Sequence, residues 1–349
     1  FDASASDVEK VSKQWDTATA QRQAYNKLMG WLDSPIVQAQ YVLPATAPGG
    51  SQGNWIADFV AEMGIAKNGR WLSLGCGSGG QEMYAVDQNL CVRLDAYDIS
   101  PQSIAQAMQT AKERGLRDIY FDVGNFHEIP LPKHQYDVVI MSMSLHHVAE
   151  LNWLLPRIGH TLKPGGWFLV NEYVGPAQFQ YNPKTLEIVA DILALLPDRL
   201  RYDYVHQKIK EKYVMQPREY WFLVDPSEAI CSDHIESALH RYFHVRAQHD
   251  YGGSYINLLL EHIIGNFDPE NEGEVMLIRL LGYFEKRLIQ EGVLENCFAL
   301  FAMQPKSGFR FLTLLSLPFQ FWDKARIVIW KRDALYRRVR KRLHSMLRL

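Results

Sequence analysis

The order of hydrophobic and polar positions divides the chain into stretches with different patterns. Residues 1–65 read mostly as helices, with apolar residues at mixed three- and four-residue spacing from Val8 to Trp31 and another helix from Asn54 to Met63. From Trp71 to about residue 175, short apolar runs alternate with helical segments. The pattern then loosens, and the chain closes on a basic stretch. The middle of the chain therefore predicts an α/β domain.

The alternating stretch predicts strands that are each followed by a turn or a helix. Repeated strand-then-helix units form a parallel sheet that is covered on both faces. Right-handed crossovers then place the carboxyl ends of the first, second and fourth strands at one rim, where such sheets bind ligands. The predicted strands are Trp71–Leu74, Val92–Tyr97, Ile119–Val123, Asp137–Met143 and Trp167–Tyr173, with helices at Gln81–Asn89 and Pro101–Arg114.

The later residues complete the predicted sheet and add helical segments. A helical insertion is predicted at about 177–240, followed by a sixth strand at Tyr242–His249, a helix at Glu274–Gln290 and a last strand at Phe298–Met303. We therefore expect a doubly wound, mostly parallel, seven-stranded sheet. The expected domains are an N-terminal helical cap at 1–65, a ligand-binding domain at 66–305 and a basic amphipathic tail at 306–349.

Composition is consistent with a folded protein in a reducing compartment. Of the 349 residues, 47% are hydrophobic and 22% are charged, which are ordinary globular values. The four cysteines are far apart and form no C-x-x-C pair, so we expect reduced thiols without a disulfide framework or zinc site. The sequence contains no apolar run long enough to span a bilayer and no secretory signal pattern. A cytoplasmic location is expected.

The stretch LSLGCGSGGQE after the first strand allows two interpretations. Gly75, Gly77 and Gly80 fit G-x-G-x-x-G, which holds a pyrophosphate at a helix N-terminus, whereas Gly75, Gly77 and Gly79 fit G-x-G-x-G, which lets a cofactor without phosphate approach the backbone. Asp98 ends the second strand, and its carboxylate can accept ribose hydroxyls from either ligand. The glycines and Asp98 therefore leave the ligand open.

Later motifs favour the second interpretation. Asn125 and Phe126 follow the third strand and can offer an amide and an aromatic face to an adenine, and a fourth strand with Ser142 turns into LHHV. A fifth strand, after the turn K-P-G-G, carries Glu172 to its end. In this order and spacing, over roughly residues 55–175, the set resembles the class I S-adenosylmethionine-dependent methyltransferases, which have a Rossmann-like fold.

The resemblance implies S-adenosylmethionine as the cofactor and assigns residues to it. It implies that the glycine loop lies under the methionine part of the cofactor, that Asp98 holds the ribose, and that Asn125 and Phe126 lie at the edge of the adenine. Ser73 stands where the family usually has an acidic residue, which puts the hold on the cofactor's amino group in doubt, and Asn125 stands where the family often has Asp. The cofactor set is Gly75, Cys76, Gly77, Gly79, Asp98, Ile99, Asn125, Phe126 and Ser142.

A second, less specific resemblance bears on the acceptor. Glu172 to Pro176 read E-Y-V-G-P, and Trp31 to Pro35 read W-x-x-x-P. Both elements are similar to those of bacterial methyltransferases associated with carbohydrate assembly. This implies O-methylation of a sugar or glycan hydroxyl, with a lipid or a small natural product as alternative acceptors.

Methyl transfer to a hydroxyl needs an aligned acceptor and a base that removes its proton. The candidates are His146, His147 and Glu172, at the rim of strands four and five. Either His can instead cap or pack, and Glu172 can instead bond a neighbouring loop. The aromatic residues of the insertion can form a lid or a core. No set of His residues has metal-ligand spacing with a third ligand, so no metal is expected.

The tail is the most basic part of the chain. Residues 306–349 contain 12 Lys or Arg and two Asp, a balance of +10 in a chain of net charge -2. Leu335, Val339, Leu343 and Met346 form an apolar stripe among arginines, which is typical of a helix on an anionic membrane surface. Packing on the protein itself or on a partner is the alternative. No nucleic-acid substrate is expected.

Two rival functions stay open on the residues alone. A dinucleotide-dependent oxidoreductase would use the Gly80 register, and a non-catalytic scaffold would keep the fold without the chemistry. The intact glycines and Asp98 oppose the scaffold, while Ser73 mildly favours it. The sequence does not define the oligomeric state.

Overall fold

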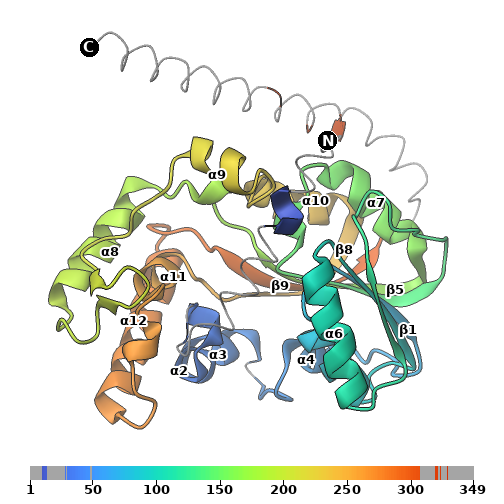
Figure 1. Ribbon diagram of the computed structural model, residues 1–349, viewed down its shortest axis with the longest axis horizontal. Coiled ribbons are helices and arrows are strands. Elements are labelled where there is room, and N and C mark those ends of the chain that lie inside the picture. The colour runs from blue at the N-terminus through green and yellow to red at the C-terminus, as the bar shows by residue number, and fades with distance from the viewer. Residues whose placement is uncertain are drawn as a thin grey trace.

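A seven-stranded sheet forms the centre of the computed structural model, which describes residues 10–13, 28, 30–47, 49–306, 319–320, 323 and 328 (Figure 1). The strand order is β3-β2-β1-β4-β5-β9-β8, in which β9 runs antiparallel to both neighbours and the first five strands are parallel. The predicted doubly wound, mostly parallel sheet is confirmed. The strands are β1 Arg70–Leu74, β2 Arg93–Asp98, β3 Ile119–Val123, β4 Tyr136–Ser142, β5 Leu162–Tyr173, β8 Phe243–Asp250 and β9 Phe298–Pro305.

Helices cover both faces of the sheet, as the alternating pattern predicts. Trp71 packs with α4, α5 and α6 on one face, while Leu72 and Leu74 pack with α7 and α10 on the other. The strand residues alternate between two apolar layers because successive side chains of a strand point to opposite faces. The helices are α4 Trp55–Glu62, α5 Gly80–Asp87, α6 Pro101–Glu113, α7 Leu151–Thr161, α8 Pro183–Leu195, α9 Arg218–Val224, α10 Ser232–Tyr242, α11 Tyr255–Leu260 and α12 Glu272–Gln290.

The fifth strand begins earlier than the sequence pattern predicts. It starts at Leu162, which pairs with Tyr136 ahead of a register shift, and not at Trp167. The K-P-G-G turn at residues 163–166 is therefore part of the strand's irregular start, and α7 ends before it at Thr161. The other predicted strands of the sheet agree with the structure to within two residues at either end.

The insertion between β5 and β8 is not purely helical, so that prediction was wrong in part. It contains α8, α9 and α10 together with a two-stranded hairpin, β6 Tyr202–Asp203 and β7 Lys208–Ile209. Strands of two residues are too short to show alternation in a sequence. On the left of Figure 1, α8, α11 and α12 lie together, away from the side of the sheet where α6 lies.

The segment before α4 packs on a late helix. Its short helices are α2 Pro35–Val37 and α3 Leu43–Thr46, joined by a π-helical turn, and this turn contacts α12. Tyr41 in the turn donates a hydrogen bond to buried Glu285 of α12. Most of the helix predicted at Val8–Trp31 lies outside the described residues.

The described tail residues contact the body of the protein. The carboxylate of Asp323 accepts hydrogen bonds from the backbone and side-chain amides of Asn152 in α7, and the Arg241 guanidinium lies 3.9 Å from the centre of the Phe319 ring. The predicted apolar stripe from Leu335 to Met346 lies outside the described residues. Within the part of the chain that the structure describes, no helix has the length and apolar character needed to cross a bilayer.

Candidate active site

A cavity of about 480 Å³ opens at the carboxyl ends of β1, β2 and β4. This is the rim that the crossover rule predicts, and the volume lies within the range of small-molecule sites. Most of the predicted cofactor residues line it. They are Gly75, Cys76, Gly77, Asp98, Ile99, Asn125, Phe126 and Ser142.

The glycine loop approaches the cavity closely. Gly75 and Gly77 both have positive φ, and a Cβ on Gly75 would lie 2.4 Å from the Cβ of Ser144. A Cβ on Gly77 or Gly80 would meet no atom within 4 Å, so a side chain there would occupy open space. Gly77 and Gly80 thus form a cradle for a ligand.

Gly79, which the sequence interpretation assigned to the cofactor, and its neighbour Gly80 lie differently relative to the cavity. Gly80 lines the cavity, whereas Gly79 does not. Gly79 has a φ of +76°, and a Cβ on it would lie 2.5 Å from the Phe121 ring. Gly79 therefore lets α5 start close to the sheet, and Gly80 faces the ligand space.

Asp98 joins the glycine loop to the start of α6. One carboxylate oxygen accepts the amide of Gly77 at 2.8 Å, and the other accepts the amide of Ser100 at 2.9 Å. Burial raises the pKa of Asp98, and these amide donors oppose that rise. The carboxylate is thereby fixed in the cavity wall.

Ser73 does not line the cavity, but a carboxylate bonded to it does. Glu82, in the first turn of α5, lines the cavity and is 2% exposed. The Ser73 hydroxyl donates to Glu82 Oε1 at 2.6 Å. The loop that lacks an acidic residue at position 73 therefore has one nearby in space.

Glu172 holds the turn after β4 and does not line the cavity, contrary to a direct role in the chemistry. Its Oε2 accepts the amides of Ser144, Leu145 and His146 at 3.0, 2.6 and 3.3 Å, and its Oε1 lies 2.5 Å from His146 Nδ1. It is fully buried. Of the two roles considered for Glu172, the structure shows the hydrogen bond to a neighbouring loop.

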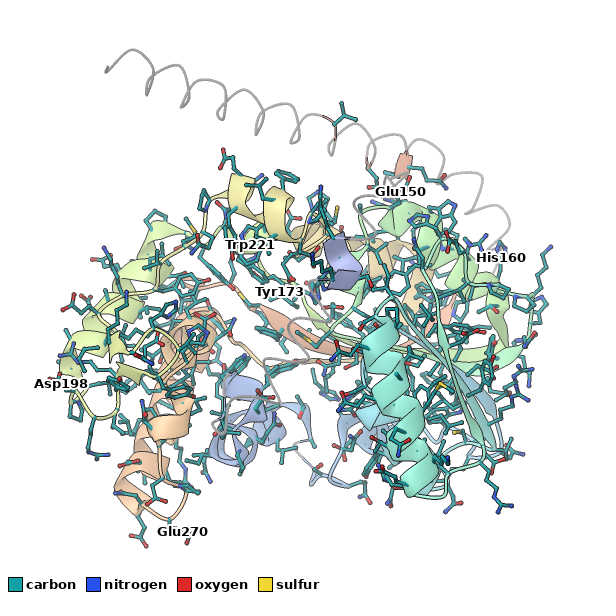
Figure 2. The ribbon with its side chains drawn as sticks, viewed as in Figure 1. Glu150, His160, Tyr173, Asp198, Trp221 and Glu270 are labelled. Atoms are coloured by element: carbon teal, nitrogen blue, oxygen red, sulfur yellow. The ribbon has the colours of Figure 1, made fainter. Side chains whose placement is uncertain are left out.

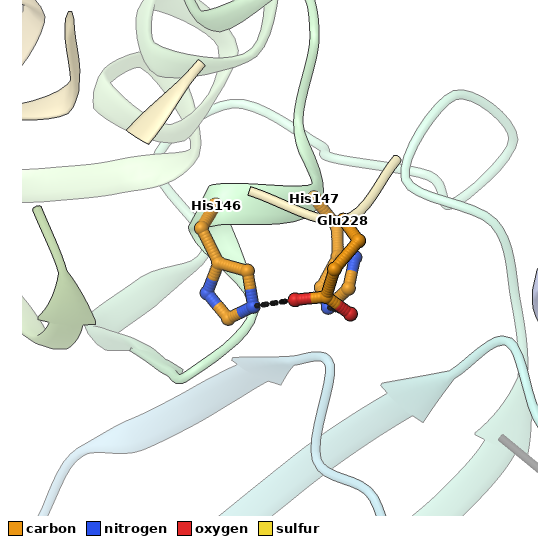
Figure 3. A group of neighbouring side chains, drawn as sticks. All are labelled: His146, His147 and Glu228. Atoms are coloured by element: carbon orange, nitrogen blue, oxygen red, sulfur yellow. Dashed lines mark ion pairs between the residues drawn. The ribbon is translucent and has the colours of Figure 1, made fainter. Parts of the chain in front are cut away.

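His146 lies behind the cavity wall and carries a proton. Burial alone would lower its pKa, but Glu172 at Nδ1 and Glu228 at Nε2 outweigh burial and raise the pKa to about 10. The Nε2 to Glu228 Oε1 distance is 3.5 Å (Figure 3). Protonated His146 and ionised Glu228 therefore form a buried ion pair, and His146 is not a suitable base.

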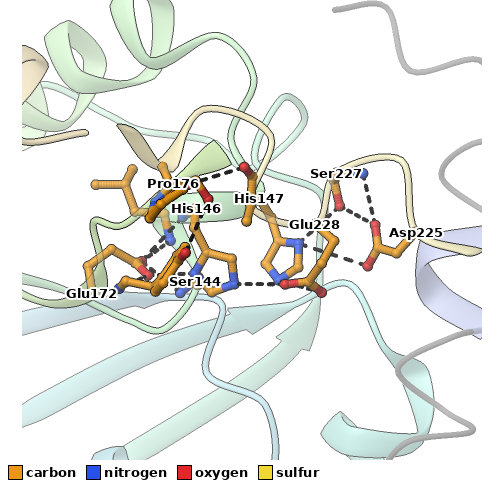
Figure 4. Close-up of polar contacts among 12 residues, drawn as sticks. Ser144, His146, His147, Glu172, Pro176, Asp225, Ser227 and Glu228 are labelled. Carbon is orange, nitrogen blue, oxygen red and sulfur yellow. Dashed lines mark hydrogen bonds and ion pairs between the residues drawn. The ribbon is translucent and has the colours of Figure 1, made fainter. Parts of the chain in front are cut away.

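His147 lines the cavity, and its Nδ1 contacts Ser227 of the insertion (Figure 4). Nδ1 lies 3.0 Å from Ser227 Oγ, which itself donates to Asp225 Oδ1 at 2.6 Å. Because the single hydroxyl proton of Ser227 is directed to Asp225, Ser227 Oγ accepts the Nδ1 proton of His147. Nε2 of neutral His147 then carries a lone pair; this atom is buried and lies 4.0 Å from Glu228 Oε2.

The environment keeps His147 neutral. Burial lowers its pKa, and so does the charge of His146, whose ring centre is 4.2 Å away, while Glu228, Asp225 and Glu172 oppose this. Neutral imidazole is the form that accepts a proton. Of the two adjacent His residues, one is therefore cationic and the other is neutral.

The same residues include a group of side chains with the geometry to hold a metal ion, which the sequence spacing did not indicate. One donor atom from each of His146, His147 and Glu228 lies within 4.8 Å of the others. A second such group, Asp203, His206 and His262, lies at the insertion hairpin. In the first group, protonation of His146 and its ion pair with Glu228 occupy two of the three donors.

The insertion contributes to the cavity through a loop and not through its aromatic residues. Pro226, Ser227 and Ile230 line the cavity. Phe179 packs against both Tyr173 and Trp221, with ring centres 5.0 and 5.2 Å away. Tyr173 and Trp221 are labelled in Figure 2. The aromatic lid is therefore not what closes this cavity.

Sequence reasoning missed Glu82, Asp225, Ser227 and Glu228. Glu82 carried a usable signal, because it is an acid in the first turn of the helix after a glycine loop that lacks its usual acid. The other three carried no signal, since D-P-S-E reads as an ordinary turn some 80 residues from His147 and only tertiary packing brings it to the site.

A sheet of this order, with a glycine loop after β1 and a carboxylate at the end of β2 in one cavity, defines a domain of the class I methyltransferase type. Residues 72–170 match the family model described as a methyltransferase domain. This segment is therefore an S-adenosylmethionine-dependent methyltransferase domain. The open cradle at Gly77 and Gly80 and the fixed carboxylate of Asp98 fit that cofactor.

Individual relatives match only part of the chain. A trans-aconitate 2-methyltransferase of Mycobacterium tuberculosis is 32% identical over 113 residues, which is 32% of this chain and 40% of the relative. An uncharacterised protein of Escherichia coli is 29% identical over 97 residues, 28% of this chain and 46% of that protein. The chain thus matches less than half the length of these curated relatives.

A solved structure resembles a larger part of the chain. It is the geranyl diphosphate C-methyltransferase of Streptomyces coelicolor, with 14% identity and a TM-score of 0.47 over 87% of this chain and 99% of that chain.

Proposed function

We propose that this protein transfers a methyl group from S-adenosylmethionine to a hydroxyl group of an uncharged acceptor of the sugar or glycan type. The observation that carries the proposal is His147, whose Nδ1 is bonded to Ser227 and whose ring lines the cavity. Bound S-adenosylmethionine supplies a methyl group on a positively charged sulfur. His147 Nε2 removes the proton of the acceptor hydroxyl.

The residues behind His147 act by positioning it. Asp225 directs the Ser227 hydroxyl, and Ser227 fixes the His147 tautomer. Glu172 holds the backbone of the turn on which His146 and His147 lie. Positioned general bases contribute on the order of 10² to 10⁴ in rate, so loss of His147 should be severe.

The charges of the cavity argue against an anionic acceptor. Its described lining includes the carboxyl groups of Glu82 and Asp98 but no Lys or Arg. A tricarboxylate such as trans-aconitate, named for the relatives, would find no Lys or Arg in this described lining to bind it. A neutral polyhydroxy acceptor needs no such cation and can use the polar lining at Ser142 and His127.

The test is methyl transfer from S-adenosylmethionine with a deuterated methyl group, followed by mass spectrometry. Neutral sugars and glycosides should gain the label, trans-aconitate should not, and His147→Gln should lower the rate at least about 100-fold. Faster labelling of trans-aconitate than of any neutral hydroxyl compound would contradict the acceptor class. Labelled lipids or natural products would instead favour those acceptors.

Two controls separate the rival interpretations. Stabilisation against heat by NAD but not by S-adenosylhomocysteine would contradict the cofactor and favour an oxidoreductase. Treatment with EDTA should leave the rate unchanged, because His146 and Glu228 pair with each other. Loss of activity in EDTA, restored by one divalent cation, would instead assign a metal to His146, His147 and Glu228.

A further inference from the structure

Glu82 is a buried acid that the mechanism above does not use. It is the third residue of α5, is 2% exposed and lines the cavity together with Gly77 and Asp98. Charged residues are rarely buried unless they are paired. Its surroundings therefore indicate what Glu82 binds.

The two oxygens of the Glu82 carboxyl group have different partners. Oε1 accepts the Ser73 hydroxyl at 2.6 Å. Among the described residues, buried Oε2 has no hydrogen-bond partner. A buried acceptor left unsatisfied is costly, and a donor from a ligand in the cavity would remove that cost.

The protein supplies no cation for this acid within the cavity. The described lining contains no Lys or Arg, and the nearest acidic neighbour, Asp98, adds repulsion. Burial raises the pKa of Glu82 to about 7; bonds from Ser73 and from the backbone oppose that rise, and Asp98 adds to it. A cationic ligand group would favour the ionised form.

S-adenosylmethionine carries such a group on its methionine part. We propose that Glu82 takes the place of the acid missing at position 73: its Oε2 accepts a hydrogen bond from the α-ammonium group of the cofactor, and Ser73 is a positioning residue that holds Oε1. This inference rests on the proposed function. It moves the acid from the end of β1 to the first turn of α5, where the helix N-terminus also favours negative charge.

The experiment compares two ligands by calorimetry. S-adenosylhomocysteine has the amino-acid part, whereas 5′-methylthioadenosine keeps the adenine, ribose and sulfur without it. Glu82→Gln should weaken S-adenosylhomocysteine binding about 10- to 100-fold and leave 5′-methylthioadenosine binding within about threefold. Equal losses for both ligands, or no loss for either, would overturn the inference.

A reciprocal variant guards against a merely structural effect. Adding Ser73→Asp to Glu82→Gln returns the acid to the end of β1, so S-adenosylhomocysteine affinity should recover at least about tenfold over the single variant. If S-adenosylhomocysteine affinity does not recover while 5′-methylthioadenosine binding stays intact, an acid at position 73 cannot substitute for Glu82. That result would overturn the proposal that Glu82 replaces the missing acid.

Proton release gives a third measurement that is independent of activity. At pH 6 the raised pKa leaves Glu82 largely protonated, so S-adenosylhomocysteine binding to the wild type should release about one proton, measured across buffers of different ionisation enthalpy. Glu82→Gln should release none, and equal release from both proteins would overturn the inference. A wild type that binds neither ligand would overturn the proposed function and this inference together.

Discussion

At the scale of single residues, the site depends on two adjacent histidines in different charge states. His146 lies between two carboxylates, and His147 bonds a hydroxyl whose proton is committed elsewhere. The sequence showed both histidines but not which of them is protonated, because the residues that decide it are distant along the chain. These residues are Glu172, Asp225 and Glu228. The sequence did not decide between the two roles of Glu172 for the same reason.

The rate of methyl transfer should fall at acid pH through His147. Burial and the charge of His146 lower the pKa of His147, while Glu228, Asp225 and Glu172 oppose that shift. A base acts in its neutral form, so the rate should be constant at neutral pH and decline only below the ordinary histidine pKa of about 6.5. Rate profiles from pH 5 to 8 test this. Ser227→Ala should lower the plateau rate of methyl transfer while leaving S-adenosylhomocysteine binding intact. An unaltered plateau rate would contradict the assigned tautomer of His147.

Glu172→Gln should destabilise the fold. The change replaces a buried carboxylate that accepts three turn amides and pairs with His146, at a cost of about 3 kcal/mol in the free energy of unfolding. Glu187→Gln is the matched control, since Glu187 pairs with Lys184 at the surface and should cost less than about 1 kcal/mol. Urea unfolding of both variants decides, and equal midpoints would refute the anchoring role.

At the scale of elements, the sequence predicted where most strands of the sheet lie. It did not predict the features that depend on contacts with residues distant along the chain. Apolar runs located β1 to β4 because each strand carries its own pattern. The early start of β5 depends on pairing with β4, and hairpin β6–β7 is too short to carry a pattern. Gly79 and Gly80 could not be distinguished in sequence, because only the position of Phe121 separates their roles.

Gly79→Ala should disturb the junction of β1 and α5. The alanine would require positive φ and would bring its Cβ to within 2.5 Å of Phe121, so we expect a loss of about 2 kcal/mol or more in unfolding free energy. Gly64→Ala is the control, since it shares the positive φ but meets no atom within 4 Å, and should cost about 1 kcal/mol. Thermal melts that rank the two variants in the opposite order would contradict the assignment.

At the scale of the whole molecule, opposite charges separate along the chain. The tail carries a balance of +10 within a total of -2, so the preceding residues are acidic. Two of its described residues, Phe319 and Asp323, contact α10 and α7. The composition of the sequence revealed the charge of the tail but not this contact. The contact depends on Asn152 and Arg241, which only the fold brings next to the tail.

Removal of residues 308–349 should abolish binding to anionic liposomes and leave S-adenosylhomocysteine affinity unchanged. We propose that the basic residues at 337–342 attract anionic lipid, so wild-type binding should also weaken as salt rises. Sedimentation with phosphatidylserine vesicles measures the binding, and neutral phosphatidylcholine vesicles are the control. Liposome binding that survives the truncation would exclude the tail as the anchor.

The loop at 225–230 has a consequence for how this chemistry could diversify. The matched segment, residues 72–170, contains the glycine loop, Asp98 and His147, whereas the partners that orient His147 lie outside it. The residues that we propose for the cofactor and the loop that orients His147 are thus encoded in separate stretches of the gene. An exchange of the insertion between related chains could therefore redirect the methyl group to a new acceptor while the donor site stayed the same.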